Sequence, residues 1–251
     1  KRPPLKRLAC LLFLLLPAIS QAQEWLIYTH SLGNQGVLID GQLHGREHAG
    51  KRAFYLELVH MLLADLGKPL PIQEVPLARG LVLLKEQRNV VLFNLSQTPE
   101  RQPLAHWVGP TLAETDYLYE STKRPTGIRT LMDAQNLPVC VLNGSTHDDL
   151  LSAAGFAQIK RNSSYANCLR MLAAGRVALV ASADAGLKQK LQDAQVNAQE
   201  VQASAVKLGS DHGYIALSLG IPAPQVAQWR AALQRSQADG RFQKLYERYA
   251  Q

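Results

Sequence analysis

Short apolar runs alternate with amphipathic helical stripes along this chain, and this alternation is the feature that most constrains its fold. Residues 25–28 are a continuous apolar run, and the segment 89–93 is apolar after Asn89, as expected of buried strands. Between them, apolar residues recur at helical spacing over residues 54–66, and Gly67 is a typical stop signal. Unbroken apolar strands require a sheet that is covered by helices on both faces. The pattern therefore predicts an α/β protein with mostly parallel sheets.

A second round of alternation begins after Pro110. The pattern predicts further strands at 71–75, 117–119, 139–142, 177–180, 201–206 and 214–217, and further helices at 77–87, 148–153, 166–174, 185–193, 223–238 and 241–249. Two rounds followed by a returning segment favour two lobes joined by crossings near residues 112–118 and 201–214. Periodicity alone does not separate this arrangement from one larger doubly wound sheet.

The first 22 residues have the layout of a secretory signal. A basic start precedes an apolar run, and the small residues of Ser20-Gln21-Ala22 predict cleavage after Ala22. The run is too short to span a membrane, and Cys10 lies at its front, which disfavours lipid attachment. Removal of the signal takes away four of the 27 basic residues and none of the 20 acidic ones, which leaves a formal charge of +3.

The remaining charges and cysteines set further limits. The basic residues form no stripe with interleaved aromatics, so we expect no nucleic-acid partner. No second long apolar run follows the signal, so we expect a soluble protein after cleavage. Cys140 and Cys168 are the cysteines that follow the signal. In an oxidising compartment they form either one disulfide or two separate buried thiols, and the sequence leaves both open.

Polar residues that suit a small anion follow a buried strand in each predicted lobe. In the first lobe, residues 94–101 read Asn-Leu-Ser-Gln-Thr-Pro-Glu-Arg, and the guanidinium of Arg101 offers two parallel hydrogen bonds to a carboxylate. Asn94, Ser96 and Thr98 precede it and are candidates to assist. Each of these residues taken alone is also consistent with an ordinary surface loop.

In the second lobe, Gly144-Ser145-Thr146 precedes a predicted helix that begins near residue 147. Free amides and the positive end of the helix dipole favour an anion there. A Ser or Thr at this position is also a routine helix cap. Ligands of open parallel sheets bind at the carboxyl ends of strands, where both segments lie.

These segments together resemble family 3 periplasmic solute-binding proteins, which supply polar amino acids to ABC importers. The likeness covers residues 94–101, the Trp-Val-Gly-Pro of 107–110, the first helix at 50–64, the Gly-Ser-Thr turn at 141–146 and the closing helix at 240–249. The resemblance implies a type II periplasmic-binding-protein fold, with residues 23–113 and 206–251 in one lobe and residues 114–205 in the other. It also implies a monomer in the periplasm that closes around a small carboxylate-bearing ligand and delivers it to an inner-membrane permease or a sensor. By the resemblance, this ligand is expected to be an amino acid.

The chain departs from the family where the ligand's ammonium group binds. By spacing, the acid that pairs with that group falls on Ala183, and Asp184 follows one residue later. Asp184 either replaces it or begins the next helix. The aromatic wall of the site is also weak: Tyr28 is a candidate substitute, or else a core residue. Arg79 either adds charge to the cleft or is a solvated helix residue.

Two other motifs are set aside. Residues 44–48 fit the His-x-x-Glu-His pattern of a zinc peptidase class, but Gly45 disfavours the required helix, so we expect a solvated loop. Gly45 to Lys51 mimics a phosphate-binding loop, but Arg52 stands where magnesium needs Ser or Thr. We therefore expect no metal, no cofactor and no catalytic residues. The alternatives are an enzyme on the same fold that resembles cyclohexadienyl dehydratases, and a sensor subunit without a transport role.

Overall fold

The computed structural model describes residues 24–250, and the predicted signal with Cys10 lies outside this range. The described chain is a mixed α/β protein, as the alternation predicts. The strands are β1 Leu26–Thr29, β2 Gly36–Ile39, β3 Gln42–Gly45, β4 Ile72–Glu74, β5 Val90–Ser96, β6 Ala105–Val108, β7 Ala113–Ser121, β8 Val139–Leu142, β9 Ile159–Asn162, β10 Leu179–Ala183 and β11 Val201–Ser218. The helices are α1 Lys51–Asp65, α2 Leu77–Glu86, α3 Leu131–Ala134, α4 Thr146–Ala153, α5 Tyr165–Ala173, α6 Leu187–Ala194, α7 Ala223–Ala238 and α8 Arg241–Leu245, with shorter helical turns at Gly33–Gln35, Gln102–Leu104, Ala198–Glu200 and Tyr246–Ala250. None of these helices is long and apolar enough to cross a bilayer.

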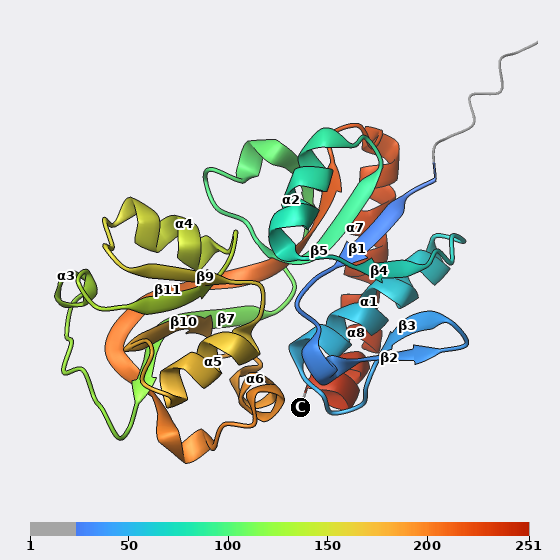
Figure 1. Ribbon diagram of the computed structural model, residues 1–251. Helices are drawn as coiled ribbons and strands as arrows, with labels where there is room; N and C mark the ends of the chain where they lie inside the picture. The colour runs from blue at the N-terminus through green and yellow to red at the C-terminus, as the bar shows by residue number, and fades with distance from the viewer. Residues whose placement is uncertain (1–23, 251) are drawn as a thin grey trace, which may run out of the picture.

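Two half-sheets meet at one shared strand and form two lobes, which lie on the right and left of Figure 1. The strand order is β4-β1-β5-β11-β7-β10-β8-β9, and β6 pairs with β11 beside the path. Strands β1, β4 and β5 pair in parallel in the first lobe, and β8, β9 and β10 do so in the second. The parallel pairing within each lobe, apart from the crossing strands, agrees with the predicted fold class.

The two crossings are β7 and β11. Strand β11 runs without a break from Val201 to Ser218, pairing with β7 in its first part and with β5 and β6 in its last. The sequence predicted two separate strands here, which is wrong. Polar residues and the glycines Gly209 and Gly213 conceal the continuity, because a strand that passes between two lobes is half-exposed and lacks a continuous apolar face.

Each half-sheet is covered by helices on both faces. In the first lobe, α1 and α7 pack on one face around Phe54 and Trp229, and α2 packs on the other. In the second lobe, α3 and α4 lie on one face and α5 and α6 on the other. Cys140 of β8 and Cys168 of α5 form a disulfide that joins the sheet to a helix, so the structure decides between the two states that the sequence left open.

A β-hairpin occupies part of the region where a solvated loop was expected. Strands β2 and β3 pair through a two-residue turn at Asp40 and Gly41, which both have positive φ, 50° and 76°. This geometry is the type I′ turn that suits the twist of paired strands, and Asp-Gly is a preferred sequence for it. His44 therefore lies in a strand rather than in a loop, which corrects the expectation for residues 44–48.

Candidate functional site

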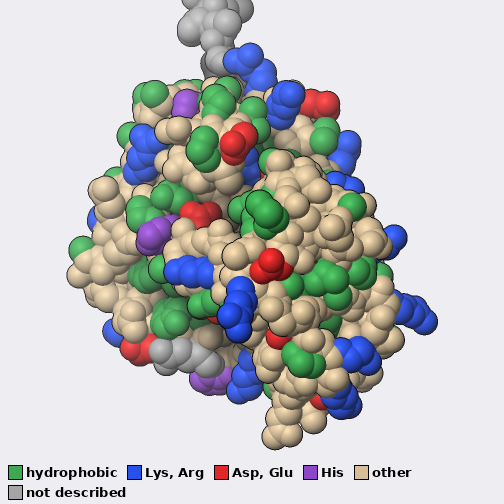
Figure 2. All heavy atoms as spheres, turned by 90° about the vertical axis from the view of Figure 1, so that its left-hand side faces the viewer, with side chains coloured by type: hydrophobic (Ala, Val, Ile, Leu, Met, Phe, Trp, Pro, Cys, Tyr) green, Lys and Arg blue, Asp and Glu red, His purple; other side chains and the backbone are tan. Residues whose placement is uncertain are grey.

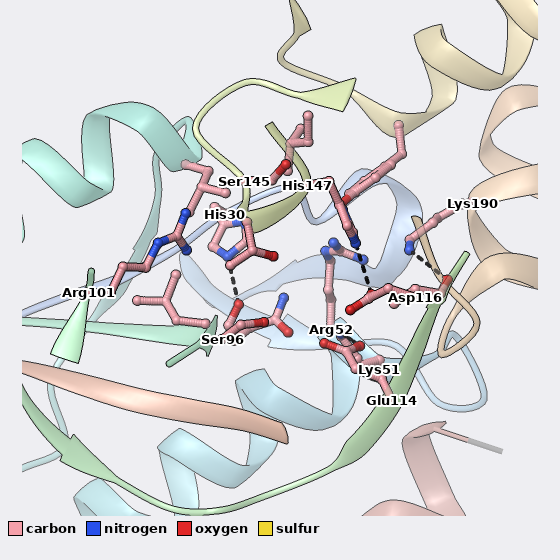
Figure 3. A pocket seen from close by; sticks show the side chains of 17 residues that line it. His30, Lys51, Arg52, Ser96, Arg101, Glu114, Asp116, Ser145, His147 and Lys190 are labelled. Carbon is pink, nitrogen blue, oxygen red and sulfur yellow. Dashed lines mark hydrogen bonds and ion pairs between the residues drawn. The ribbon is translucent and has the colours of Figure 1, made fainter. Parts of the chain in front are cut away.

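A cavity lies between the two lobes, at the carboxyl ends of β5 and β8. The space between its lining residues measures about 460 Å³ with open solvent included. Figure 3 shows its side chains converging from both lobes. It is lined by His30, Lys51, Arg52, Leu77, Asn94, Leu95, Ser96 and Arg101 of the first lobe, and by Glu114, Asp116, Leu142, Ser145, Thr146, His147, Tyr165, Ala183 and Lys190 of the crossing strand and second lobe.

Arg101 reaches from the first lobe to the second. Its backbone amide is held by the carbonyl and hydroxyl oxygens of Thr98, which fixes the turn after β5. The side chain is buried, and its Nη2 donates to the carbonyl oxygen of Gly144 at 2.8 Å and to the carboxylate of Asp149 at 2.9 Å. Because Asp149 is largely exposed, this ion pair is weakened by solvent.

A β-bulge turns Asn94 toward the cavity. The register between β5 and β11 shifts between Tyr214 and Ile215, so Asn94 has no residue opposite it. Asn94 has a φ of 61°, and it lines the cavity together with Ser96. Bulges of this kind bend a strand and redirect a side chain. The first-lobe wall of the cavity therefore depends on a local irregularity in β5.

The turn from Gly144 to Thr146 forms the facing wall. Ser145 caps α4, because its side chain accepts from the amide of Asp148. Gly144 has a φ of 73° and packs against Ala78 of the first lobe, where an added Cβ would lie 3.2 Å from the Cα of Ala78. The two lobes touch at this point.

His30 is a buried neutral side chain in this cavity. Its Nε2 donates to the carbonyl oxygen of Asn94 at 3.0 Å, and its Nδ1 lies 3.1 Å from the hydroxyl of Ser31. Burial, followed by the charge of Arg52, lowers the pKa of His30 to about 3. The ring is therefore uncharged at neutral pH and helps to hold the bulge at Asn94.

Cationic side chains gather at the opposite end of the cavity from Arg101 (Figure 3). Lys51 forms an ion pair with Glu114. The guanidinium of Arg52 lies 5.5 Å from the ring centre of Tyr165, and the ammonium of Lys190 lies 4.3 Å from it. Arg52 therefore contacts the second lobe through an aromatic ring.

Asp116 and His147 line the same end of the cavity as the cations, away from Arg101 (Figure 3). Oδ1 of Asp116 is 2.9 Å from Nε2 of His147, although the approach does not have hydrogen-bond geometry. Burial acts to raise the pKa of Asp116, but His147 and then the cations Lys51 and Lys190 outweigh it and hold the pKa below its usual value. Asp116 is therefore ionised at neutral pH.

The predicted site residues divide into two groups. Asn94, Ser96, Arg101, Ser145 and Thr146 line the cavity. The others do not line it. Gly144 accepts a hydrogen bond from Arg101 through its carbonyl oxygen, and Thr98 lies in an adjoining hollow that shares Asp116, Thr146 and His147 with the cavity. Tyr28 packs against the core beneath α2, Arg79 is exposed, and the exposed Asp184 accepts from the amides of Thr115 and Ala185. A role for these residues in binding stays a prediction, and the carboxylate of Asp184 is engaged at the crossing strand.

Sequence reasoning missed the cationic end of the cavity. Lys190 carried a signal, because it lies on the same face of α6 as the buried Leu191 and Ala194, where a lysine is unexpected. Lys51 and Arg52 were considered only as part of a phosphate-binding loop. Their approach to the second lobe depends on how the lobes meet, which local sequence does not determine.

The histidine motif at residues 44–48 joins a different cluster. Ligand atoms of His44, Glu57 and His60 lie within 4.8 Å of one another, on β3 and α1. His44 pairs with Glu57, which also accepts from the amide of Gly45, and His60 contacts the carbonyl of Leu43. These contacts tie the β2–β3 hairpin to α1, and the helix required by the peptidase motif is absent at residues 44–48.

Charged side chains are interspersed on the face of the second lobe. Figure 2 shows Lys and Arg side chains dispersed among acidic and apolar ones there. The pattern on this face differs from the basic stripe that nucleic-acid binding requires.

Comparisons with known proteins agree on the fold. No known family and no curated protein matches the sequence. Among solved structures, a mutant of ArgBP from T. maritima is 17% identical with a TM-score of 0.75, covering 89% of this chain and 93% of its own. A histidine kinase sensor domain with similarity to periplasmic binding proteins is 15% identical with a TM-score of 0.76, at 89% and 94% coverage. The amino acid ABC transporter substrate-binding protein AbpA from Streptococcus pneumoniae, bound to L-arginine, is 14% identical with a TM-score of 0.72, at 89% and 93% coverage.

The chain thus has the two-lobed fold of the periplasmic solute-binding proteins, which the sequence motifs predicted. At these identities the likeness establishes the fold alone, and the function has to be inferred from the residues of the cavity.

Proposed function

We propose that this protein is a periplasmic solute-binding protein that captures a small carboxylate-bearing ligand by closure of its two lobes. The observation that carries the proposal is the buried guanidinium of Arg101 in the cavity between the lobes, facing the capped start of α4. A guanidinium and a helix start are both suited to a carboxylate. The solved structures that share the fold support the proposal, because one of them is bound to L-arginine.

Closure follows from the way contacts are divided between the lobes. Arg101 with Gly144, Lys51 with Glu114, and Arg52 with Tyr165 join elements of the first lobe to the crossing strand or the second lobe. A ligand that contacts both walls stabilises the closed arrangement more than an open one, which shifts the population toward closure. The closed shape is then recognised by an inner-membrane permease.

A thermal-shift screen of the mature protein, residues 23–251, tests this proposal. Amino acids, polyamines and small carboxylates form the panel, and we expect carboxylate-bearing compounds to raise the melting temperature because ligands that bind only the folded state stabilise it. Small-angle scattering with the best compound should show a radius of gyration no larger than without it. If no small carboxylate binds, the proposal is wrong.

A sensor role is the second candidate. The histidine kinase sensor domain that shares the fold favours it. The genes that flank this one separate the two roles: permease and ATPase genes indicate import, whereas a kinase or cyclase gene indicates sensing.

The enzyme alternative requires a general acid in the cavity. Asp116 does not suit that task, because its lowered pKa leaves it ionised. Turnover of prephenate or arogenate by the purified protein would support the enzyme and contradict a pure binding role.

A further inference from the structure

Two buried cations in the cavity have no carboxylate partner. Lys190 is 4% exposed, and its ammonium contacts the hydroxyl of Ser182 at 2.7 Å and the carbonyl of Ala183 at 3.5 Å. Arg52 is also 4% exposed, and its Nε has no hydrogen-bond partner. Among residues 24–250, no carboxylate oxygen lies within 4.0 Å of either charge.

This arrangement is unfavourable for the protein alone. A buried charge is costly unless an opposite charge or several hydrogen bonds compensate it. Burial, and then the charges of Arg52 and Lys51, lower the pKa of Lys190 well below its usual value. Tyr165 offers the face of one ring to both cations, which offsets only part of the cost. An anion bound beside them would remove the penalty.

The carboxylates nearby form no ion pair with Arg52 or Lys190. Glu114 pairs with Lys51, and Asp116 lies against His147. Glu74 and Asp193 lie beyond the wall formed by Arg52, Tyr165 and Lys190, and they accept from the amides of Leu32 and Asn34. Of the cavity-lining side chains, four are Lys or Arg and two are carboxylates, so positive charge is in excess.

The position of the missing family acid points the same way. Ala183 lines the cavity where the resemblance places an acid for the ligand's ammonium group, and its carbonyl is within reach of Lys190. Asp184 does not take over, because its carboxylate accepts from the amide of Thr115 on the crossing strand. The ammonium of Lys190 thus lies 3.5 Å from the carbonyl oxygen of the residue at which the resemblance places an acid.

We propose that the ligand is a dicarboxylate, with one carboxylate held by Arg101 and the second held by Arg52 and Lys190 at the other end of the cavity. The proposal rests on the proposed binding function and specifies its ligand class. Acidic amino acids and plain dicarboxylic acids share this chemistry. Asp116 distinguishes them, because its ionised carboxylate lines the cavity and attracts the α-ammonium group that only the acidic amino acids carry.

Calorimetric titration of the mature protein tests the proposal. The probes are aspartate, glutamate, succinate and glutarate as dicarboxylates, and alanine, arginine and butyrate as single-carboxylate compounds. We expect the best dicarboxylate to bind at least tenfold more tightly than any single-carboxylate compound. Tighter binding of aspartate or glutamate than of succinate or glutarate assigns the ammonium group to Asp116.

Two lysine substitutions in α6 compare the proposed carboxylate site with an exposed position on the same helix. Lys190→Met keeps the length of the side chain and removes its charge, so the best dicarboxylate should bind at least tenfold more weakly. The ligand-free variant should melt at a higher temperature than the wild type, because a buried uncompensated charge is gone. Lys188→Met changes an exposed lysine two residues earlier in α6 and should leave both quantities unchanged. Arg52→Gln provides a second test of the same carboxylate site.

Different results would overturn the proposed ligand class and the proposed binding function. If alanine or arginine binds more tightly than every dicarboxylate, or if Lys190→Met and Arg52→Gln both bind dicarboxylates as the wild type does, the ligand class is wrong and the binding function stands. If none of the probes binds, the proposed function itself is wrong.

Discussion

Nη2 of Arg101, in the first lobe, donates a hydrogen bond of 2.8 Å to the carbonyl oxygen of Gly144, in the second. One side chain thus both lines the cavity, as the group that we propose to bind a carboxylate, and makes a contact between the lobes. Arg101 presents several donors in a fixed fork, so a contact with Gly144 leaves others for a ligand. If Arg101 binds the ligand as we propose, this relationship couples occupancy of the cavity to closure.

Replacing Arg101 should remove most of the binding affinity. Loss of one partner of a buried charged pair costs about 2–5 kcal/mol, and the lower end corresponds to roughly a 30-fold weaker affinity. Titration of Arg101→Ala with the best ligand of the screen measures this loss. Arg129→Ala, which changes an exposed arginine of the second lobe, is the control and should bind as the wild type does. Equal affinity in both variants would refute the assignment.

Gly144→Ala should hinder closure. The added methyl meets Ala78 of the first lobe at 3.2 Å, and a left-handed φ of 73° adds about 1 kcal/mol of strain. Gly155→Ala is the matched control, because Gly155 has a φ of 76° and nothing within 4 Å of the added Cβ. Both variants should lose similar stability in urea, but only Gly144→Ala should bind ligand more weakly and have a larger radius of gyration.

The disulfide should contribute substantially to stability. Cys140 and Cys168 are 28 residues apart, and closure of a loop of this length stabilises a protein by about 3–4 kcal/mol through restriction of the unfolded chain. The Cys140→Ala, Cys168→Ala double variant should have a free energy of unfolding that is lower by that amount, which is measured from a lower urea midpoint. Adding a reductant should lower the urea midpoint of the wild type and leave the midpoint of the variant unchanged. An unchanged midpoint in the double variant would show that the bond is dispensable.

His30 should make the protein less stable in acid. Its pKa is about 3 in the folded state and about 6.5 in the unfolded state, so between these values only the unfolded chain binds the proton. Stability is therefore complete above pH 6.5 and falls as the pH is lowered toward 3, by roughly 1.4 kcal/mol per pH unit. Urea midpoints from pH 7.5 to 4.5 should show a smaller decline for His30→Gln than for the wild type. His212→Gln, at an exposed position, should decline as the wild type does.

Much of the fold can be predicted from local sequence, because the buried residues of a strand or helix are apolar at a regular spacing. The apolar run at residues 89–93 predicted β5, and the stripe around Phe54 predicted α1. Arg101 and Ser145, which line the cavity, were predicted as site residues because each follows a buried strand and belongs to a residue type that suits an anion. The type I′ turn at Asp40 and Gly41 left a trace as well, although the hairpin that it forms was not predicted.

Tertiary structure alone decided how the two lobes meet, and that determines the charge of the cavity. Arg52 and Lys190 are 138 positions apart, and both approach the ring of Tyr165 only because α1, α5 and α6 come together when the lobes close. Local sequence predicted most of the elements, their order and the arginine that we propose to bind a carboxylate, since these depend on neighbours along the chain. The unpaired cations, the disulfide and the continuity of β11 depend on neighbours in space, which periodicity and spacing do not encode.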